Sequence, residues 1–348
     1  MRQFLLVSYF YSRNDGVGGA RAECLSKVLQ SSGYDVELIS RNTFGNDIAA
    51  YNLLWAIKCL LRVLFSKAEN VYLTCGPFWH LPFVLMALAI KKKYFIFDLR
   101  DSWSLNIVRS YGGTSQKSTS SITRYLSEYI EKKTYQACDE FWVCTPGMVD
   151  GYTALFGDGS KIKLVLNGHD LSEIYKDSSI QDLVNNKQKN DQLKLVCIGK
   201  FAEYGEEKAQ KVFDVMKAYV EAKKSDVQLF VIGANPEVNN CFVEKQGMAN
   251  YVKIMPAMPY KDAINFASQA DYGICIIRDE EIDFGTKVFD YIAIGLPIVD
   301  VFDEQSAFKK YFSNYIYNLF DNSSYKWALA DFKQYSREQQ LQNAVSKI

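Results

Sequence analysis

The sequence predicts an α/β protein built from two doubly wound domains. Short apolar runs of strand length alternate with longer stretches of helical period along most of the 348 residues. This alternation occurs in two cycles, which the polar segment 172–192 separates. Strand–helix alternation is typical of parallel sheets with helices on both faces. We therefore expect Rossmann-like domains over 1–175 and 176–315, facing each other across a cleft, and a helical segment over 316–348 that packs back on the first domain.

The first cycle contains six candidate strands and five candidate helices. The strands are expected at Phe4–Tyr9, Asp35–Ile39, Asn70–Leu73, Tyr94–Asp98, Glu140–Cys144 and Lys163–Leu166. The helices are expected at Gly19–Ser31, Ile48–Phe65, Leu81–Ile90, Ile122–Tyr135 and Gly147–Leu155. The Gly- and Ser-rich segment 111–121 predicts a mobile loop.

The second cycle repeats the same rhythm. Strands are expected at Leu193–Gly199, Gln228–Gly233, Val252–Met255, Tyr272–Ile276 and Pro297–Val301. Helices are expected at Glu206–Val220, Tyr260–Ser268 and Lys287–Ile294. In open parallel sheets, ligands bind at the carboxyl ends of the strands, and the unusual polar clusters of this chain fall at such positions.

Composition excludes several classes of protein. A formal net charge of zero argues against a nucleic-acid binder, and two histidines argue against a His-rich metal site or a Ser-His-Asp triad. The eight cysteines form no Cys-x-x-Cys pair, so we interpret them as free thiols of a reducing compartment. We expect no secretory leader, because residues 1–3 run directly into a strand, and no membrane span, because the longest apolar runs fall short of ~20 residues. The expected location is the cytoplasm.

The most informative stretch is Asp283–Val299. A glycine-containing loop leads into a short helix, and Gly-Leu-Pro then hands over to an apolar strand. Backbone N–H groups, the Lys287 ammonium and a helix N-terminus meet here, which suits a phosphate. Asp290, one turn into the helix, can reach a sugar hydroxyl beside that phosphate. An ordinary loop–helix–strand connection explains the pattern equally well.

Two clusters follow strands of the first domain. Asn14–Arg21 has the place of a dinucleotide fingerprint, but Arg21 stands where the third glycine belongs. The Gly18–Gly19 pair still allows close approach to a ligand, although it can instead be a turn that lets the helix pack. After the fourth strand, 98–103 reads Asp-Leu-Arg-Asp-Ser-Trp. These charges and the indole can hold a polar substrate whose hydroxyl a carboxylate orients, or Arg100 can form a structural ion pair.

Two further clusters lie near the second domain. Lys200 follows its first strand and Lys208 begins the next helix, so the two ammonium groups can balance a diphosphate, although surface lysines are usually only solvated. Asn167–Asp170, which includes His169, reads as a turn leading into the linker.

The stretch Leu53–Lys67 is very apolar, with Lys58 and Arg62 on one side. A helix that covers the core, with its basic side chains reaching outward, is the interpretation that the pattern favours. The alternative is a helix that lies on a membrane surface.

Taken in order, these clusters resemble the GT-B glycosyltransferases, in particular the retaining nucleotide-sugar enzymes of glycosyltransferase family four. The resemblance spans about residues 4–301, and its most specific part is Thr286–Val299, similar to the family's Lys-x-x-Glu-Tyr-x-Ala-x-Gly-x-Pro, with Lys287 and Asp290 on the matching positions. Asp290 replaces the family's usual Glu, and the first Glu of the family's Glu-x7-Glu pattern falls on Ile282.

The resemblance implies a role for each cluster. The donor diphosphate would be neutralised by Lys200 and Lys208, its ribose bound by Asp290, and its phosphate cradled by the amides of Phe284, Gly285, Thr286 and Lys287. Gly18 and Gly19 would close over the donor, while Asp98, Arg100 and Trp103 would form the acceptor pocket and Asp101 would act with the two lysines in catalysis. No metal or other cofactor is implied, because lysines and a helix dipole would stabilise the leaving group.

The resulting hypothesis is a retaining transferase that moves a sugar from a nucleotide-sugar to a glycan. We expect a lipid-linked acceptor at the inner membrane face, in the assembly of a surface polysaccharide such as O-antigen, capsule or exopolysaccharide, with peripheral contact through Leu53–Lys67 and no nucleic-acid partner. Two alternatives remain: a nucleotide-sugar epimerase of the same fold, and a catalytically degenerate domain that serves as a binding or scaffold protein. The broken glycine fingerprint disfavours a nicotinamide dehydrogenase.

Overall fold

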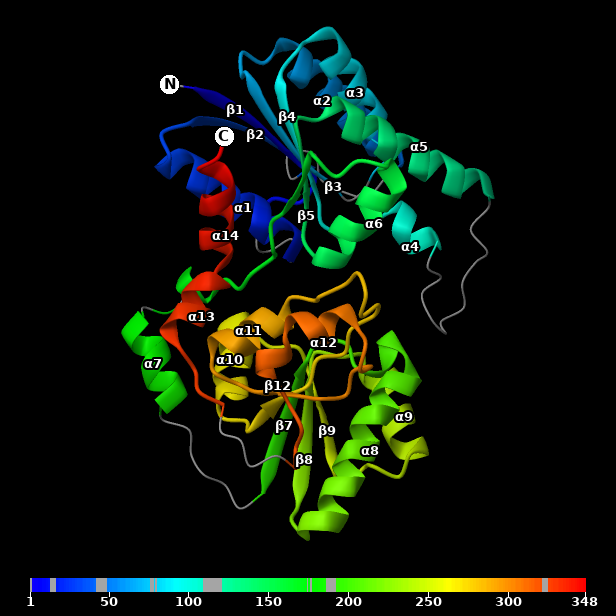
Figure 1. Ribbon diagram of the computed structural model, residues 1–348, viewed down its shortest axis with the longest axis vertical. Helices are drawn as coiled ribbons and strands as arrows, with labels where there is room; N and C mark the ends of the chain where they lie inside the picture. The colour runs from blue at the N-terminus through cyan, green and yellow to red at the C-terminus, as the bar shows by residue number, and fades with distance from the viewer. Residues whose placement is uncertain are drawn as a thin grey trace. The chain divides into compact units, whose positions relative to one another are not determined.

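A computed structural model of the chain divides into two compact units (Figure 1). It describes residues 2–12, 17–41, 49–75, 78, 80–108, 121–173, 175, 177–185, 192–320 and 325–348. The first unit takes in the described residues up to 167 together with 337–348, and the second takes in 168–336. Most of the predicted loop at 111–121 lies outside the described residues.

The first unit is built on a six-stranded parallel sheet in the order β2-β1-β3-β4-β5-β6. Its strands are β1 (Gln3–Ser8), β2 (Asp35–Ser40), β3 (Asn70–Cys75), β4 (Tyr94–Leu99), β5 (Glu140–Val143) and β6 (Ile162–Leu164). The strand order reverses between β1 and β3, which is where ligands bind in open sheets of this kind.

Helices cover both faces of this sheet. They are α1 (Val17–Ser31), α2 (Ala49–Phe65), α3 (Leu81–Ile90), α4 (Ser104–Val108), α5 (Ser121–Ala137), α6 (Pro146–Phe156) and α14 (Arg337–Val345). Successive residues of β1 point to opposite faces: Leu5 and Val7 join the core beneath α2, α3, α5 and α6, whereas Phe4 and Leu6 join the core beneath α1 and α14. Helix α14, from the end of the chain, packs against α1.

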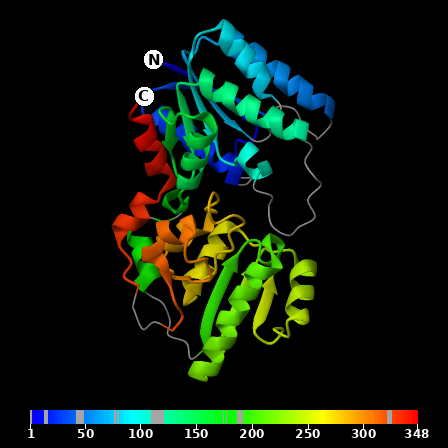
Figure 2. The same ribbon diagram turned by 45° about the vertical axis from the view of Figure 1, so that its right-hand side comes forward.

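The second unit repeats this plan with the parallel order β12-β11-β10-β7-β8-β9. Its strands are β7 (Leu193–Ile198), β8 (Val227–Ile232), β9 (Val252–Met255), β10 (Tyr272–Gly273), β11 (Ile298–Val299) and β12 (Ile316–Tyr317). Its α-helices are α7 (Asp177–Asn185), α8 (Glu206–Lys223), α9 (Pro236–Lys245), α10 (Tyr260–Ser268), α11 (Lys287–Ala293), α12 (Ala307–Tyr311) and α13 (Leu329–Gln334), and its short 3-10 helices are η3 (Leu171–Glu173), η4 (Ala202–Tyr204) and η5 (Ser313–Tyr315). Helices α8 and α9 lie on one face of the sheet, with α10 and α11 on the other (Figure 2).

The predicted fold class is confirmed, since both sheets are parallel and doubly wound. Most predicted strands agree with the structure to within one or two residues, but β10 and β11 are only two residues long. Residues 274–276, predicted as part of β10, form no regular strand pairing. The reason is that residues 274–277 lead directly into the loop that precedes α11. Among the described residues, no helix is both long enough and apolar enough to cross a membrane.

Candidate functional site

The loop before α11 is shaped by one glycine and one aromatic side chain. Gly285 has a φ of 62°, in the left-handed region that glycine adopts without cost, and a Cβ there would lie 3.3 Å from Cδ1 of Ile277. Phe284 is buried, and its ring centroid lies 5.0 Å from that of Phe312. Thr286 then precedes the first residue of α11. The buried Phe284 ring therefore anchors the loop between β10 and α11 to the core of the second unit.

Asp290 is the centre of a small polar cluster on α10 and α11. It is only 3% exposed, and its Oδ1 accepts a hydrogen bond of 2.6 Å from the Tyr260 hydroxyl. Its Oδ2 lies 3.2 Å from Nζ of Lys287, one turn earlier on the same helix. The Lys287 ammonium also lies 5.4 Å from the centre of the Tyr260 ring. The structure thus brings Lys287 and Asp290 together, as the sequence pattern required, and adds a phenol.

Lys208 lies where α8 approaches the segment that follows β10. Its ammonium donates hydrogen bonds of 2.5 and 2.6 Å to the carbonyl oxygens of Ile277 and Arg278. These carbonyls belong to the segment that enters the Gly285 loop, so the positive charge of Lys208 is held at this end of the sheet. This charge is of the sign that a phosphate requires.

Lys200 is placed differently from Lys208. It is exposed in the loop after β7, and its ammonium lies 5.3 Å from the centre of the Tyr204 ring. The loop is fixed by Glu203, whose carboxylate accepts hydrogen bonds from the backbone N–H groups of Phe201 and Asn235 at 2.9 and 2.8 Å. These contacts support the loop and leave the Lys200 ammonium at the surface.

Ile282 occupies the position at which the family pattern has its first glutamate. It is 2% exposed and belongs to the apolar interior. Its two acidic neighbours serve local structure: Glu281 accepts a hydrogen bond from the Ala307 N–H at 3.3 Å, and Asp283 lies 3.1 Å from Nε of Arg278. The described residues therefore place no carboxylate of 281–283 in the position of that glutamate.

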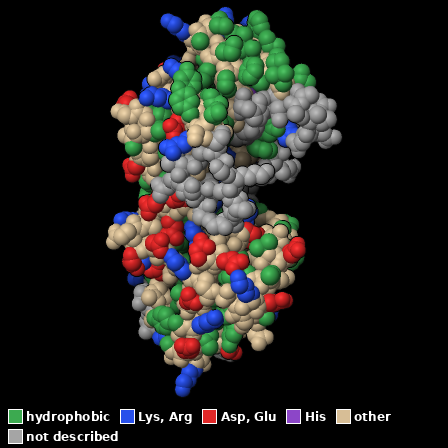
Figure 3. All heavy atoms as spheres, turned by 90° about the vertical axis from the view of Figure 1, so that its right-hand side faces the viewer, with side chains coloured by type: hydrophobic (Ala, Val, Ile, Leu, Met, Phe, Trp, Pro, Cys, Tyr) green, Lys and Arg blue, Asp and Glu red, His purple; other side chains and the backbone are tan. Residues whose placement is uncertain are grey.

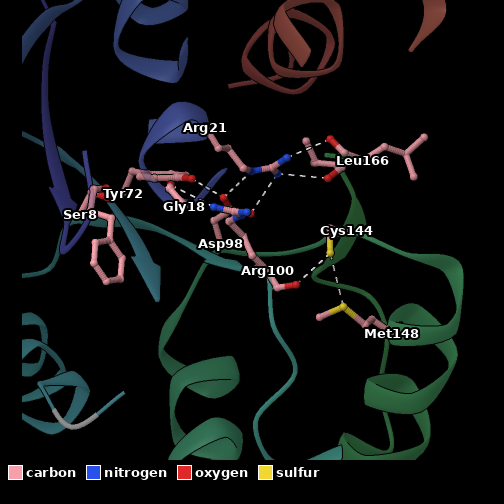
Figure 4. A network of polar contacts seen from close by, with 11 residues as sticks. Ser8, Gly18, Arg21, Tyr72, Asp98, Arg100, Cys144, Met148 and Leu166 are labelled. Carbon is pink, nitrogen blue, oxygen red and sulfur yellow. Dashed lines mark hydrogen bonds and ion pairs between the residues drawn. The ribbon is translucent and has the colours of Figure 1, made fainter. Parts of the chain in front are cut away.

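In the first unit, the glycine pair lies in the first turn of α1, close to the end of β1. A Cβ at Gly19 would lie 2.7 Å from the backbone nitrogen of Ser12 and closer still to its carbonyl oxygen, so only glycine fits there. Gly18 is less crowded, since a Cβ there would lie 3.5 Å from Phe10. The Gly18 carbonyl accepts a 2.9 Å hydrogen bond from Arg100, which ties the chain after β1 to the chain after β4 (Figure 4).

Behind this contact lies a buried ion pair (Figure 4). Asp98 is fully buried, and Arg21 approaches both of its carboxylate oxygens, at 2.7 and 3.0 Å. Arg21 also donates to the carbonyls of Val165 and Leu166 at 3.1 and 2.9 Å, and the Tyr72 hydroxyl donates to Asp98. Arg21, in the place of the third glycine of a dinucleotide fingerprint, is thus a fixed part of the core that joins α1, β3, β4 and the chain after β6.

Burial and the ion pair act in opposite directions on Arg21. Burial, the largest single influence, lowers the pKa of the guanidinium, but its neighbours, Asp98 foremost, together raise the pKa above its ordinary value. Burial, followed by the Asp98 charge, also raises the pKa of the Tyr72 hydroxyl. Arg21 therefore stays charged, and Tyr72 stays protonated and able to donate.

The rest of the loop after β4 is held by a second buried carboxylate. Glu131 of α5 accepts hydrogen bonds from the backbone N–H groups of Trp103 and Ser104 at 3.3 Å, and from the Tyr152 hydroxyl at 2.8 Å. Burial raises the pKa of Glu131 to about 7, although these donors act to lower it. The Trp103 ring stacks on Phe78 with centroids 4.6 Å apart, and Asp101 is exposed at the tip of the loop.

The comparisons with known proteins concern the second unit most directly. Residues 192–303 match the family described as glycosyl transferases group 1. These residues carry Lys200, Lys208, Lys287 and Asp290. We refer to these matched residues, 192–303, as the group 1 domain. No curated protein sequence matches the chain.

Solved structures extend the likeness to the whole chain and show its fold. Sucrose-phosphate synthase from Thermosynechococcus elongatus is 14% identical, with a TM-score of 0.63 over 100% of this chain and 94% of that one. The Anabaena protein HepE in complex with UDP-glucose is 12% identical, with a TM-score of 0.60 over 100% of both chains. UDP-GlcNAc 2-epimerase from Methanocaldococcus jannaschii is 11% identical, with a TM-score of 0.58 over 100% of this chain and 99% of that one. The chain has the GT-B fold, in which the group 1 domain is the second of two Rossmann-like units.

The sequence pattern indicated Lys200, Lys208, Lys287 and Asp290 as candidate residues of the group 1 domain, but not the side chains that contact them. Tyr260 contacts Asp290 from 30 residues away, and no local pattern marks it. In the first unit, Tyr72 and Glu131 were missed for the same reason. The sequence did contain a signal for the role of Arg21. A charged residue that takes the place of a packing glycine is expected to be buried, and a buried charge needs a partner of opposite sign. His169, read as a turn residue, is buried, and its Nε2 contacts the Phe332 carbonyl at 2.7 Å.

Proposed function

We propose that the protein is a retaining glycosyltransferase that takes a sugar from a nucleotide-sugar donor bound at the group 1 domain. The observation that carries the proposal is the cluster of Lys287, Asp290 and Tyr260 beside the Gly285 loop. An ammonium group and backbone amides suit a phosphate, and a carboxylate within 3.2 Å of that ammonium suits the adjacent ribose hydroxyls. Phosphate and a pentose with a free 3′-hydroxyl are features that UDP-, GDP- and dTDP-sugars share.

In this proposal, the main catalytic contribution is electrostatic. Lys208, Lys287 and Lys200 stabilise the negative charge that develops on the diphosphate as the sugar leaves. Lys208 is already held at the loop through Ile277 and Arg278, so little reorganisation is needed. Lys200, exposed after β7, is the ammonium that has to move toward the donor.

For Asp290 to bind ribose, its carboxylate has to accept a hydrogen bond from a sugar hydroxyl in addition to its present partners. Each carboxylate oxygen can accept more than one hydrogen bond, so Tyr260 can stay in place while the ribose binds. The side chain of aspartate is one methylene shorter than that of glutamate. We therefore propose that the ribose lies closer to α11 than a glutamate would require.

On the acceptor side, we propose that the loop 98–103 of the first unit holds the glycan. Asp98 acts there as a positioning residue, because its oxygens are taken up by Arg21 and Tyr72. Exposed Asp101 and the stacked ring of Trp103 are the groups that would contact a sugar. The proposed acceptor is a lipid-linked glycan of a surface polysaccharide, reached at the inner membrane face with the help of the Leu53–Lys67 helix.

A second function, nucleotide-sugar epimerisation, is favoured by the similarity to UDP-GlcNAc 2-epimerase over the whole chain. Product analysis separates the two reactions. The purified protein is incubated with UDP-, GDP- and dTDP-sugars, with and without a glycan acceptor, and the sugars are followed by NMR. Transfer predicts donor consumption that requires acceptor, and a product that keeps the anomeric configuration. A new sugar nucleotide formed without acceptor would instead establish epimerisation.

A scaffold protein without activity is the third outcome of this experiment. It predicts no conversion of any sugar nucleotide under any condition. If conversion is observed, the Asp290→Ala variant serves as the control. Conversion by a contaminating enzyme would be unaffected by the substitution.

A further inference from the structure

Helix α5 has its polar and apolar faces reversed. Its buried residues are Ser127, Glu131, Thr134 and Tyr135, of which three are polar and non-aromatic. Its exposed side carries Ile122, Tyr125, Leu126 and Tyr129, with exposed fractions from 48% to 71%. A surface helix of a water-soluble domain normally shows the opposite arrangement. The outward face of α5 is therefore suited to an apolar environment.

Helix α2 carries large apolar side chains on its outward side as well as on its inward side. Trp55, Ala56, Cys59 and Val63 are buried in the core, as the inward face of a covering helix requires. On the outward side, Leu53, Leu54, Ile57, Leu61 and Phe65 are exposed, and Phe65 reaches 79%. Large apolar side chains on the outward side of a helix are expected inside a large protein or in contact with lipid. Helix α3 continues this pattern, because Met86 and Ile90 are 59% and 68% exposed and the helix contains no polar residue.

These three helices are neighbours, so their exposed side chains form one surface. Helix α3 contacts both α2 and α5 in the first unit. Of the 17 large hydrophobic residues that are exposed in the described part of the chain, 11 lie on α2, α3 and α5. The space-filling view shows hydrophobic side chains gathered on this part of the first unit (Figure 3). We call this the α2–α3–α5 surface. Contiguous apolar patches of this kind mark an interaction site.

The charges on this surface are mostly positive. Residues 53–67, 81–93 and 121–137 contain nine basic residues and two acidic ones, and one of the acidic residues is the buried Glu131. Arg62 and Arg124 are paired with Glu37 and Glu128, and Lys93 donates to backbone carbonyls at the end of α2. The remaining exposed lysines are Lys67, Lys91, Lys92, Lys132 and Lys133. Their charge is not balanced on these helices, although the whole chain has a net charge of zero.

We propose that the α2–α3–α5 surface binds an anionic phospholipid bilayer. Leu, Ile, Phe and Tyr side chains would enter the interface between head groups and acyl chains, while the lysines would contact lipid phosphates. A second copy of this chain is a poorer match, because two surfaces with the same excess of positive charge repel each other. The proposal extends the membrane contact proposed above for the Leu53–Lys67 helix to α3 and α5, and it does not depend on sugar transfer.

The test is co-sedimentation of the full chain with vesicles of phosphatidylcholine, with and without phosphatidylglycerol. We expect binding to the anionic vesicles and much weaker binding to the neutral ones. Basic residues near an anionic surface contribute about fivefold each to partitioning, so Lys91→Gln with Lys133→Gln should weaken binding roughly 25-fold at low salt. Phe65→Ser and Ile90→Ser should each weaken it by about tenfold or more, because each removes a large apolar side chain from the interface.

Matched controls lie on the second unit. Lys217→Gln with Lys223→Gln removes two exposed charges from α8, and Val238→Ser removes an exposed apolar side chain from α9. Both should leave vesicle binding unchanged. Equal losses in these controls, or no binding of the wild-type chain to anionic vesicles, would overturn the proposal. A dimer in sedimentation velocity that Phe65→Ser converts to a monomer would assign the surface to a second copy instead. Phe65 belongs to the first unit and the group 1 domain to the second. Measuring nucleotide-sugar binding by Phe65→Ser therefore tests the proposed transferase function separately from vesicle binding.

Discussion

Replacing Asp98 by alanine should destabilise the first unit strongly. The substitution leaves the Arg21 guanidinium buried, with its counter-charge removed, and deprives the Tyr72 hydroxyl of its acceptor. Breaking a buried ion pair by removing one partner costs about 3–5 kcal/mol in free energy of unfolding. The matched control is Glu206→Ala, which breaks an ion pair with Lys245 whose side chains are 62% and 59% exposed. Exposed pairs contribute about 0–1 kcal/mol, so this control should barely change the free energy of unfolding.

A double-mutant cycle separates the ion pair from the loss of a buried side chain. Arg21→Met alone should also cost about 3–5 kcal/mol, because it leaves the Asp98 carboxylate buried and removes the donors to the Val165 and Leu166 carbonyls. Combined with Asp98→Ala, it should cost clearly less than the two single changes together, since neither charge is then left alone.

Urea unfolding followed by tryptophan fluorescence measures these free energies. Trp142 reports on the site, because its ring centroid lies 5.8 Å from that of Tyr72. Additive costs of the two single changes, or a cost of Asp98→Ala no larger than that of the Glu206→Ala control, would refute the assigned network.

Three further predictions follow from other contacts. Gly19→Ala should cost about 1–3 kcal/mol or more, because its Cβ meets Ser12, whereas Gly18→Ala should be nearly neutral; urea unfolding compares them. Burial raises the pKa of Glu131 to about 7 in the folded protein from 4.5, so the folded state binds the extra proton and stability should fall by roughly 3 kcal/mol as pH rises from about 4.5 to 7. Glu131→Gln should remove that slope from a pH series of unfolding curves, and an unchanged slope would exclude Glu131 as its origin. Lys208→Met should weaken binding of a nucleoside diphosphate by roughly ten- to a hundredfold in calorimetry, and leave the nucleoside alone unaffected, since a charged hydrogen bond contributes about 1.5–3 kcal/mol.

The fold could be predicted because its signals are local. Apolar runs of strand length and stretches of helical period are visible within ten to twenty residues, and these located β1 and α8 to within a few residues. The strands that were too long in the prediction, β10 and β11, have apolar sequences whose pairing depends on neighbours distant in the chain. Hydrophobic periodicity alone cannot tell where such pairing stops.

The candidate site could be predicted only in part. The neighbourhood of Lys287 and Asp290 could be predicted because side chains three residues apart on a helix lie on the same face. The bond between Arg21 and Asp98 joins residues 77 positions apart, and nothing near either residue specifies the other. The apolar sequence of α2 suggested a membrane helix as an alternative, whereas the apolar outward face of α5 becomes visible only when its inward face is known.

Ligand-induced stabilisation tests the central claim, that the group 1 domain binds a nucleotide-sugar at Lys287 and Asp290. At a concentration of about 100 times its dissociation constant, a ligand adds about 2.7 kcal/mol to the free energy of unfolding. One of the UDP-, GDP- or dTDP-sugars should therefore raise the melting temperature of the wild-type chain by several degrees. The same ligand should produce a much smaller shift with Asp290→Ala. A series in which no sugar nucleotide changes the melting temperature, or in which Asp290→Ala responds as the wild type does, would contradict the account.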